Sequence, residues 1–216
     1  MNVWLSRLRP NLKHGAARHD LRNVYDLHRR VMTLVPDNLG EQARRVTGLL
    51  FRVEHTARGP QVLVQTQVAP DFGRLPEGYA DAEGPRRLDP FLRELHAGAL
   101  VRYRIAGNPS KRRGNSSIDL GKPGQIVPLR GADAEQWWIR KAEKHGLHIL
   151  SLIARPVPDA RGNKNGAQIK HAITQFDGVA RITDPDLVRA AVLSGIGRGK
   201  SYGCGLLSLA PLKVDR

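Results

Sequence analysis

The stretch GIGRGKSYGCGLLSLAP, residues 195–211, governs the organisation of this chain. Five of its first eleven residues are glycine, which permits positive φ angles and a close approach of the backbone to a partner. Successive free N–H groups in such a loop form a concave site for an anion. Apolar residues at helical spacing over 187–194 predict a helix before the loop, and Leu206–Leu209 predicts a buried strand after it.

The same stretch contains Gly199-Lys200-Ser201, which matches the end of the phosphate-binding loop of nucleotide hydrolases. That motif requires a glycine five positions before Gly199, where this chain has Ser194. It also requires a strand before the loop and a helix after it, and the predicted order here is the reverse. The pattern therefore argues against nucleotide hydrolysis.

The charge of the chain predicts a polyanionic partner. Its 216 residues include 35 Lys and Arg against 20 Asp and Glu, a net charge of +15. Residues 95–118 and 187–214 contain no acidic residue, which favours a nucleic-acid-binding surface. The single cysteine, Cys204, excludes an internal disulfide and a cysteine-cluster metal site. Since no apolar stretch approaches the ~20 residues of a membrane span and no secretory signal is evident, we expect a cytoplasmic protein without a membrane partner.

The periodicity of the first half predicts a ferredoxin-like order of elements, βαββαβ. His14 and His19 lie in a basic segment that we expect to be flexible. Asp20 or Asn23 is available to cap the first long helix. The expected elements are a strand over 3–8, a helix over 22–34, strands over 49–53 and 61–66, a loop over 69–89, a short helix over 90–95 and a strand over 100–105.

The second half repeats this order, so the predicted fold class is α+β with two tandem ferredoxin-like domains, residues 1–97 and 98–216. The strand over 100–105 cannot fully serve both domains, which leaves the boundary open. The further elements are a helix over 134–144, a strand over 147–154, a polar turn region over 156–166, a long strand over 168–181 and a helix over 186–194.

Tyr25 and His28 lie on the first long helix, where their rings are expected to reach solvent or a ligand. They are three positions apart, so they are neighbours on the helix surface, at the edge of the apolar stripe of Val24, Leu27 and Val31. A histidine titrates near neutral pH and can transfer a proton. By spacing alone, such a histidine is more often a packed, hydrogen-bonded residue of the core.

Four segments, in order along the chain, resemble the CasE endoribonucleases, which process type I-E CRISPR transcripts. Residues 23–29, NVYDLHR, are similar to the family's Asn-x-Tyr-x-x-His-Arg segment, and residues 62–66 look like its second sheet hairpin. Residues 108–112, NPSKR, resemble its Asn-Pro-x-Lys-Arg loop, and residues 195–211 resemble its glycine-rich ending.

The resemblance implies a cut in CRISPR repeat RNA at the 3′ base of a hairpin, without a metal ion or other cofactor. The ribose 2′-hydroxyl attacks the phosphorus, which gives a 2′,3′-cyclic phosphate and a 5′-hydroxyl. His28 then transfers a proton as acid or base, Tyr25 orients the ribose or phosphate, and Lys200 or Arg198 stabilises the phosphorane. It also implies that the hairpin stays bound and that the partners are subunits of the type I-E surveillance complex.

RNA recognition is expected to be mainly by shape and phosphate contacts, because the major groove of A-form RNA is narrow. Two alternatives stay open: a non-catalytic RNA-binding subunit of the same superfamily, and a general RNA-binding protein without hairpin preference. The candidate RNA-binding residues are Arg29, Arg104, Lys111, Arg112, Arg113, Arg155, Arg161, Lys164, Lys170, Gly197, Arg198, Gly199, Lys200 and Ser201.

Overall fold

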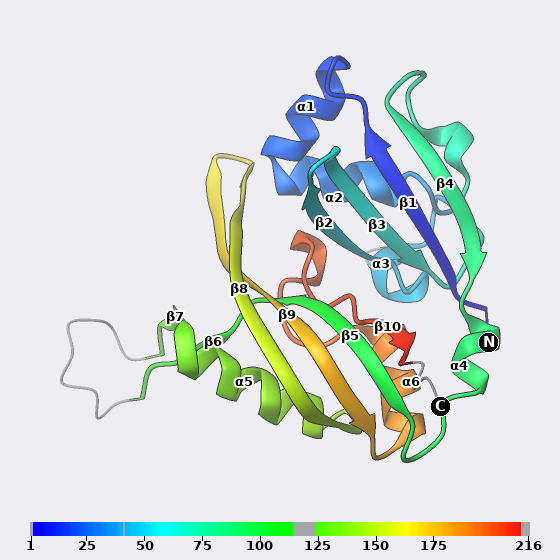
Figure 1. The fold of residues 1–216 in the computed structure, drawn as a ribbon. Coiled ribbons are helices and arrows are strands. Elements are labelled where there is room, and N and C mark those ends of the chain that lie inside the picture. The colour runs from blue at the N-terminus through cyan, green and yellow to red at the C-terminus, as the bar shows by residue number, and fades with distance from the viewer. Residues whose placement is uncertain (1, 41, 115–123, 213–216) are drawn as a thin grey trace.

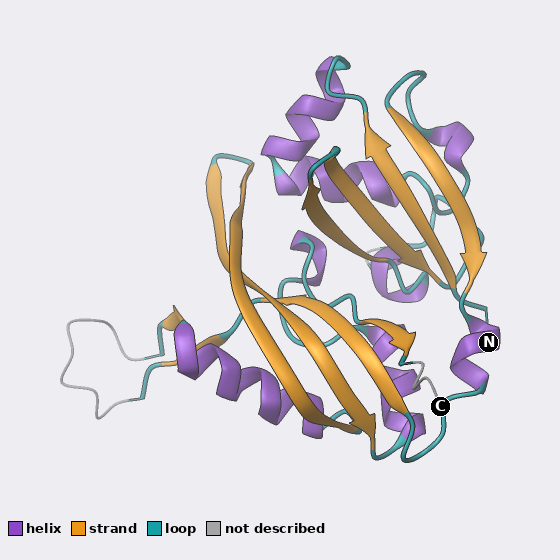
Figure 2. Ribbon diagram, in the orientation of Figure 1, coloured by secondary structure: helices purple, strands orange, loops and turns teal. Residues whose placement is uncertain are grey.

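Two four-stranded antiparallel sheets form the frame of the protein (Figure 1). The computed structural model describes residues 2–40, 42–114 and 124–212. The strand orders are β2-β3-β1-β4 and β10-β5-β9-β8, so each sheet has the ferredoxin-like arrangement in which the first and third strands are central. Helices cover one face of each sheet (Figure 2).

The first half places its two main helices against the first sheet. The apolar stripe of α2 is buried as predicted and packs with Leu8 and Phe51 in one core cluster. The elements are β1 (Trp4–Pro10), α1 (Gly15–Arg22), α2 (Val24–Met32), α3 (Ala43–Val46), β2 (Leu50–Thr56), β3 (Gly59–Thr66), the one-turn 3-10 helix η1 (Phe72–Arg74), β4 (Ala80–Arg87) and α4 (Asp89–Arg93).

The prediction for the segment before the second half is wrong. The expected loop over 69–89 contains β4, which pairs with β1 and completes the first sheet. β4 reads ADAEGPRR and lies at a sheet edge, mostly exposed, so it lacks the apolar alternation of a half-buried strand. Because β4 is the fourth strand, the strand at 100–105 belongs wholly to the second sheet, and the helix α4 lies between the sheets in sequence.

The expected flexible segment around His19 is the helix α1. Its buried Asp20 accepts hydrogen bonds from Arg30 Nε at 2.9 Å and from the Tyr79 hydroxyl at 3.0 Å. This buried carboxylate holds α1 against α2 and against the segment that leads into β4. The sequence signal was weak because the helix is short and buries little beyond Ala17 and Asp20.

The second half packs α5 and α6 on one face of its sheet, around Trp138 and Phe176. Its elements are β5 (Leu100–Gly107), β6 (Ser110–Arg112), β7 (Ile126–Pro128), α5 (Gly131–Glu143), β8 (Leu147–Lys164), β9 (Ala167–Ile182), α6 (Pro185–Ser194), η2 (Lys200–Tyr202) and β10 (Ser208–Pro211). The predicted helix, glycine loop and strand follow in the expected order. The strand, however, covers Ser208–Pro211 and is partly exposed, and the buried residues Leu206 and Leu207 precede it.

The predicted polar turn over 156–166 is wrong, because β8 continues to Lys164. The turn is only Asn165-Gly166, both with positive φ, so β8 and β9 form one long hairpin. Pro156 and Pro158 interrupt the strand signal, but β8 is an edge strand, where the missing N–H of proline is tolerated. The hairpin extends past its own sheet toward α1 and α2 (Figure 1).

The glycine-rich loop closes on itself and is anchored to both sheets. Gly205 has a φ of +90° and its N–H donates to Ala106 O on β5 at 2.8 Å, while its carbonyl accepts from Ile196 N. A Cβ at Gly195, which has a φ of +71°, would press on Leu50 of the first sheet. The predicted need for glycine is therefore confirmed at these positions.

Candidate active site

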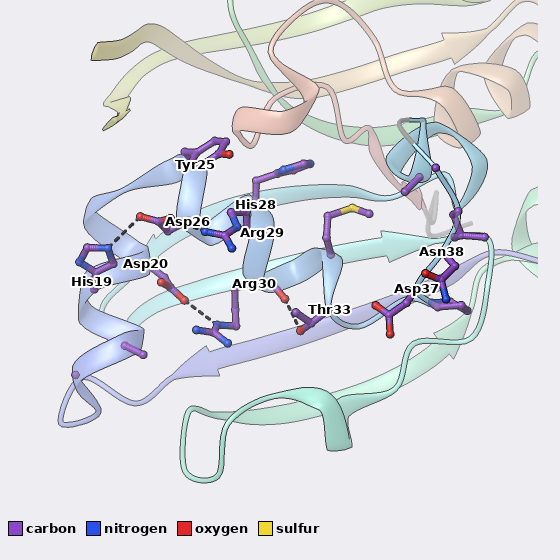
Figure 3. A pocket seen from close by; sticks show the side chains of 17 residues that line it. His19, Asp20, Tyr25, Asp26, His28, Arg29, Arg30, Thr33, Asp37 and Asn38 are labelled. Carbon is purple, nitrogen blue, oxygen red and sulfur yellow. Dashed lines mark hydrogen bonds and ion pairs between the residues drawn. The ribbon is translucent and has the colours of Figure 1, made fainter. Parts of the chain in front are cut away.

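Tyr25 and His28 project from the same side of α2, toward the glycine-rich loop (Figure 3). The helix begins at Asn23, whose side chain accepts a hydrogen bond from Tyr25 N at 3.2 Å. Because the stripe of Val24, Leu27 and Val31 is buried in the core, both polar rings stand at its edge, as the spacing predicted. Both line an open groove of about 980 Å³ that runs along α2.

His28 lies where the two halves of the protein meet. Its ring centroid is 6.2 Å from that of Phe51 on β2, and η2 of the glycine-rich loop contacts both α2 and β2. Nε2 of His28 is buried and has no hydrogen-bond partner among the described residues. The imidazole therefore has a free ring nitrogen. In a histidine with a purely structural role, such a buried nitrogen would normally form a hydrogen bond.

The pKa of His28 is lowered from 6.5 to about 4, first by burial and then by the positive charge of Arg44. This corrects the expectation that the residue titrates near neutral pH. At neutral pH the ring is therefore uncharged.

The end of the β8–β9 hairpin lies against the start of α2. Asn163 N donates to the Asn23 side-chain oxygen at 3.2 Å, so Asn23 caps α2 and also holds the hairpin. Lys164 Nζ is 5.8 Å from the centre of the Tyr25 ring. The structure thus brings a predicted RNA-binding lysine next to a predicted catalytic tyrosine, although the two residues are far apart in sequence.

The cations near the end of the hairpin are exposed. Arg161 and Lys170 lie opposite each other, and each is only 3.9 Å from Asp159 with about 70% of its side chain exposed. Arg29 is equally exposed on α2. Lys111 and Arg112 are exposed on β6 and Arg113 is partly exposed just after it; Asn108 joins this segment to β9 by donating to Ala172 O at 2.7 Å.

Arg104 and Arg155 differ from the other predicted RNA-binding cations, because both pair with the carboxylate of Asp177. Arg104 also lies 3.4 Å from Glu54 of the first sheet. These guanidinium groups are engaged in a network between the sheets. The structure does not bring them to Tyr25 and His28.

The glycine-rich loop offers fewer N–H groups than a fully open anion site. Ile196, Cys204 and Gly205 use theirs in backbone hydrogen bonds that close the loop. Within the described chain, no acceptor is found for the N–H groups of Gly197, Arg198 and Gly199. Arg198 is exposed, and Lys200 and Ser201 are partly buried in η2.

Sequence reasoning missed two residues of this region. Arg44, on the one-turn helix α3, acts on the pKa of His28, and His171 stacks on Tyr202 with ring centroids 4.7 Å apart. Neither contact has a fixed spacing in sequence, since each joins distant segments. Among the described residues, no group of three His, Cys, Asp or Glu is placed to hold a metal ion. No helix in the described ranges is long and apolar enough to cross a membrane.

The fold and the site define a basic α+β protein with two ferredoxin-like halves and a histidine with a free ring nitrogen where they meet. Residues 3–211 match the family model described as CRISPR associated protein. The chain is 34% identical to CRISPR-associated endoribonuclease Cse3 of Thermus thermophilus, over 97% of this chain and 100% of that protein. It is 32% identical to CRISPR system Cascade subunit CasE of Escherichia coli, over 88% and 94%.

A structure of Thermus thermophilus Cse3 bound to an RNA representing a pre-cleavage complex superposes with a TM-score of 0.82. It shares 32% identity and covers 98% of this chain and 100% of that one. The chain therefore belongs to the CasE family of CRISPR-associated endoribonucleases.

Proposed function

We propose that this endoribonuclease cuts precursor CRISPR RNA at the 3′ base of the repeat hairpin, without a metal ion. The observation that carries the proposal is the free Nε2 of an uncharged His28, set beside Tyr25 where the glycine-rich loop meets α2. The RNA supplies its own nucleophile, so the protein needs a proton acceptor, a proton donor and positive charge.

In this reaction the ribose 2′-oxygen forms a bond to the adjacent phosphorus and the bond from phosphorus to the 5′-oxygen breaks. Because the ring of His28 is uncharged at neutral pH and its Nε2 is free, we assign it as the acceptor of the 2′-hydroxyl proton. The 5′-oxygen takes up a proton from the protonated His28 or from water as it leaves. The products are a 2′,3′-cyclic phosphate and a 5′-hydroxyl.

Lys200 is the candidate for stabilising the phosphorane. It is partly buried in η2, which packs on α2 and β2, and burial lowers its pKa. A cation removed from water acts more strongly on a developing negative charge. Arg198 is more exposed and faces His171, whose pKa its charge lowers after the effect of burial. Tyr25 orients the ribose or phosphate through its hydroxyl.

The RNA stem is held through its backbone by two groups of cations. One group is on the hairpin and α2, and the other is on the segment of β6. Arg104 and Arg155 remain proposed contacts only if RNA displaces Asp177. The group on the hairpin and α2 consists of Arg29, Arg161, Lys164 and Lys170. The group on the segment of β6 consists of Lys111, Arg112 and Arg113.

The protein keeps the cut hairpin and acts in the cytoplasm as a subunit of the type I-E surveillance complex. The Escherichia coli relative is named as a Cascade subunit, and the Thermus thermophilus relative is described in complex with RNA. We assign residues 1–97 and 98–216 to its two domains, a division supported by the strands of the first sheet ending at Arg87 and those of the second beginning at Leu100.

The experiment that tests this function combines His28→Ala with a repeat RNA that carries one 2′-deoxy nucleotide at the cleavage site. In single-turnover assays the variant is expected to cut about 10²–10⁴-fold more slowly, the usual contribution of a positioned acid–base group. The deoxy RNA should bind normally and remain intact. His148→Ala is the matched control, because His148 is exposed on β8. Normal cutting by His28→Ala, or cutting of the deoxy RNA, would overturn the proposal.

A further inference from the structure

Arg44 occupies an unusual position for a cation. It belongs to α3, whose first residue, Ala43, lines the groove that holds Tyr25 and His28. The side chain is half-buried, and its Nη1 donates to Leu49 O at 3.3 Å, two residues before the Phe51 ring that faces His28. No carboxylate within the described ranges lies at ion-pair distance from it.

The charge of Arg44 reaches groups in both halves of the protein. After burial, Arg44 is the cause that lowers the pKa of His28 on α2 and the pKa of Lys200 on η2. The pKa of Arg44 is itself lowered by burial and by Arg45. The charge of Arg44 therefore acts on both His28 and Lys200. Among the described residues, none of these three side chains forms an ion pair.

The other elements around His28 do not account for this effect. On α2 its neighbours are Tyr25, Asp26 and Arg29, and Arg29 is 71% exposed and pairs with Asp26. On β2 the facing group is the uncharged ring of Phe51. On η2 the facing group is Lys200. Because two nearby positive charges repel each other, the placement of Arg44 and Lys200 lowers the stability of the free protein. Binding of an anion relieves this repulsion.

We propose that Arg44 is a positioning residue of the cleavage site, whose charge acts on His28 and which, with Lys200, holds the scissile phosphate between the two halves. The inference rests on the proposed function and deepens it by adding a residue from α3. A phosphate that enters the site supplies the negative charge that Arg44 and Lys200 lack among the described residues.

The test uses the full-length variants Arg44→Gln and Arg44→Lys, with Arg45→Gln as the matched control. Arg45 is adjacent and exposed, and it does not contribute to the shift of His28. An NMR titration of His28 in the RNA-free protein gives the first readout. The midpoint should rise toward 6.5 in Arg44→Gln, stay low in Arg44→Lys and remain unchanged in Arg45→Gln.

The second readout is single-turnover cleavage at saturating repeat RNA and pH 8, where His28 is uncharged in all variants. Arg44→Gln should cut about 10–100-fold more slowly, below the 10²–10³-fold loss of a direct oxyanion donor. Arg44→Lys should recover most of the rate. An unshifted His28 midpoint, or full activity of Arg44→Gln at pH 8, would overturn the inference.

The two readouts separate this inference from the proposed function. If the wild-type protein does not cut repeat RNA, the proposed function fails and the phosphate-binding part of the inference falls with it. The NMR titration still decides whether Arg44 controls His28, because it requires no RNA. If the wild type cuts and only the Arg44 results fail, the proposed function stands and Arg44 has no part in it.

Discussion

Arg52 of the first sheet donates a hydrogen bond to the carbonyl oxygen of Leu206, just after the glycine-rich loop, over 3.0 Å. Its guanidinium also donates to Ser208 Oγ at 3.0 Å and pairs with Glu54 at 2.8 Å, and its side chain is only 2% exposed. Leu50, Leu63 and Leu206 form an apolar cluster beside it. The loop that carries Lys200 is thereby tied to the sheet that carries the helix of His28.

Replacing Arg52 by Met should destabilise the protein by about 1–3 kcal/mol for each buried carbonyl oxygen that is left without a donor. Glu54 would keep only its longer contact with Arg104. Chemical denaturation monitored by circular dichroism measures the change. Arg102→Met on the neighbouring β5 is the control, since Arg102 is exposed, and its effect should stay within about 0.5 kcal/mol. Equal effects of the two substitutions would show that the Arg52 network does not hold the halves together.

The rate of cleavage should persist into mildly acidic solution. The acidic limb of kcat/KM reports the free enzyme, so its midpoint should lie near the lowered pKa of His28, about 4. A pH series at subsaturating RNA gives this midpoint. A midpoint near 6.5 would mean that His28 is solvated in the active protein or is not the proton acceptor.

Stability should also depend on His28. Between its unfolded pKa of 6.5 and its folded pKa of about 4, the unfolded chain binds a proton that the folded chain does not. The free energy of unfolding therefore falls as the pH drops through this interval, and the effect is absent above it. His28→Gln should lose less stability than the wild type between about pH 7 and pH 4. Parallel curves for the two proteins would contradict the burial of a neutral His28.

Cleavage should continue in EDTA, because the nucleophile and the acid–base groups come from the RNA and from side chains. Product ends should be a 2′,3′-cyclic phosphate and a 5′-hydroxyl, with or without the chelator. Gel analysis before and after treatment with a phosphatase that opens cyclic phosphates distinguishes the ends. Loss of activity in EDTA that Mg²⁺ restores would exclude the proposed mechanism.

The two groups of cations should differ from exposed cations elsewhere in their effect on the salt dependence of RNA binding. Replacing Arg161, Lys164 and Lys170 by Ala should reduce the slope of log K against log salt by about 0.7–0.9 for each phosphate that is no longer neutralised. The pair Lys111 and Arg112 should act likewise. Arg181→Ala, exposed at the far end of β9, is the control. An unchanged slope would show that the replaced group does not bind RNA.

Periodicity predicted the helices that form the two cores, and the resemblance to CasE proteins singled out Tyr25 and His28. The edge strands were harder, because β4 is polar and exposed and β8 contains two prolines, so neither shows the alternation of a half-buried strand. Arg104 illustrates a different limit. Its basic surroundings in sequence predicted a phosphate contact, while the fold pairs it with Asp177, which is 73 positions away.

The lowered pKa of His28 was also beyond sequence reasoning, since it arises from burial and from Arg44, which neighbours it only in the folded chain. The site as a whole is likewise formed only by folding. The spacing of Tyr25 and His28 within α2 is local, but the hairpin and the loop that lie beside them come from the other half.

The division of the site between two copies of one fold has an evolutionary consequence. The first half contributes the ring that we propose takes the proton, and the second contributes the loop and hairpin beside it. In the proposed function neither half holds a complete set of reacting groups, so neither would act as an enzyme if it were inherited alone. A gene split between Arg87 and Leu100 should yield two inert polypeptides that regain cutting only when they reassemble.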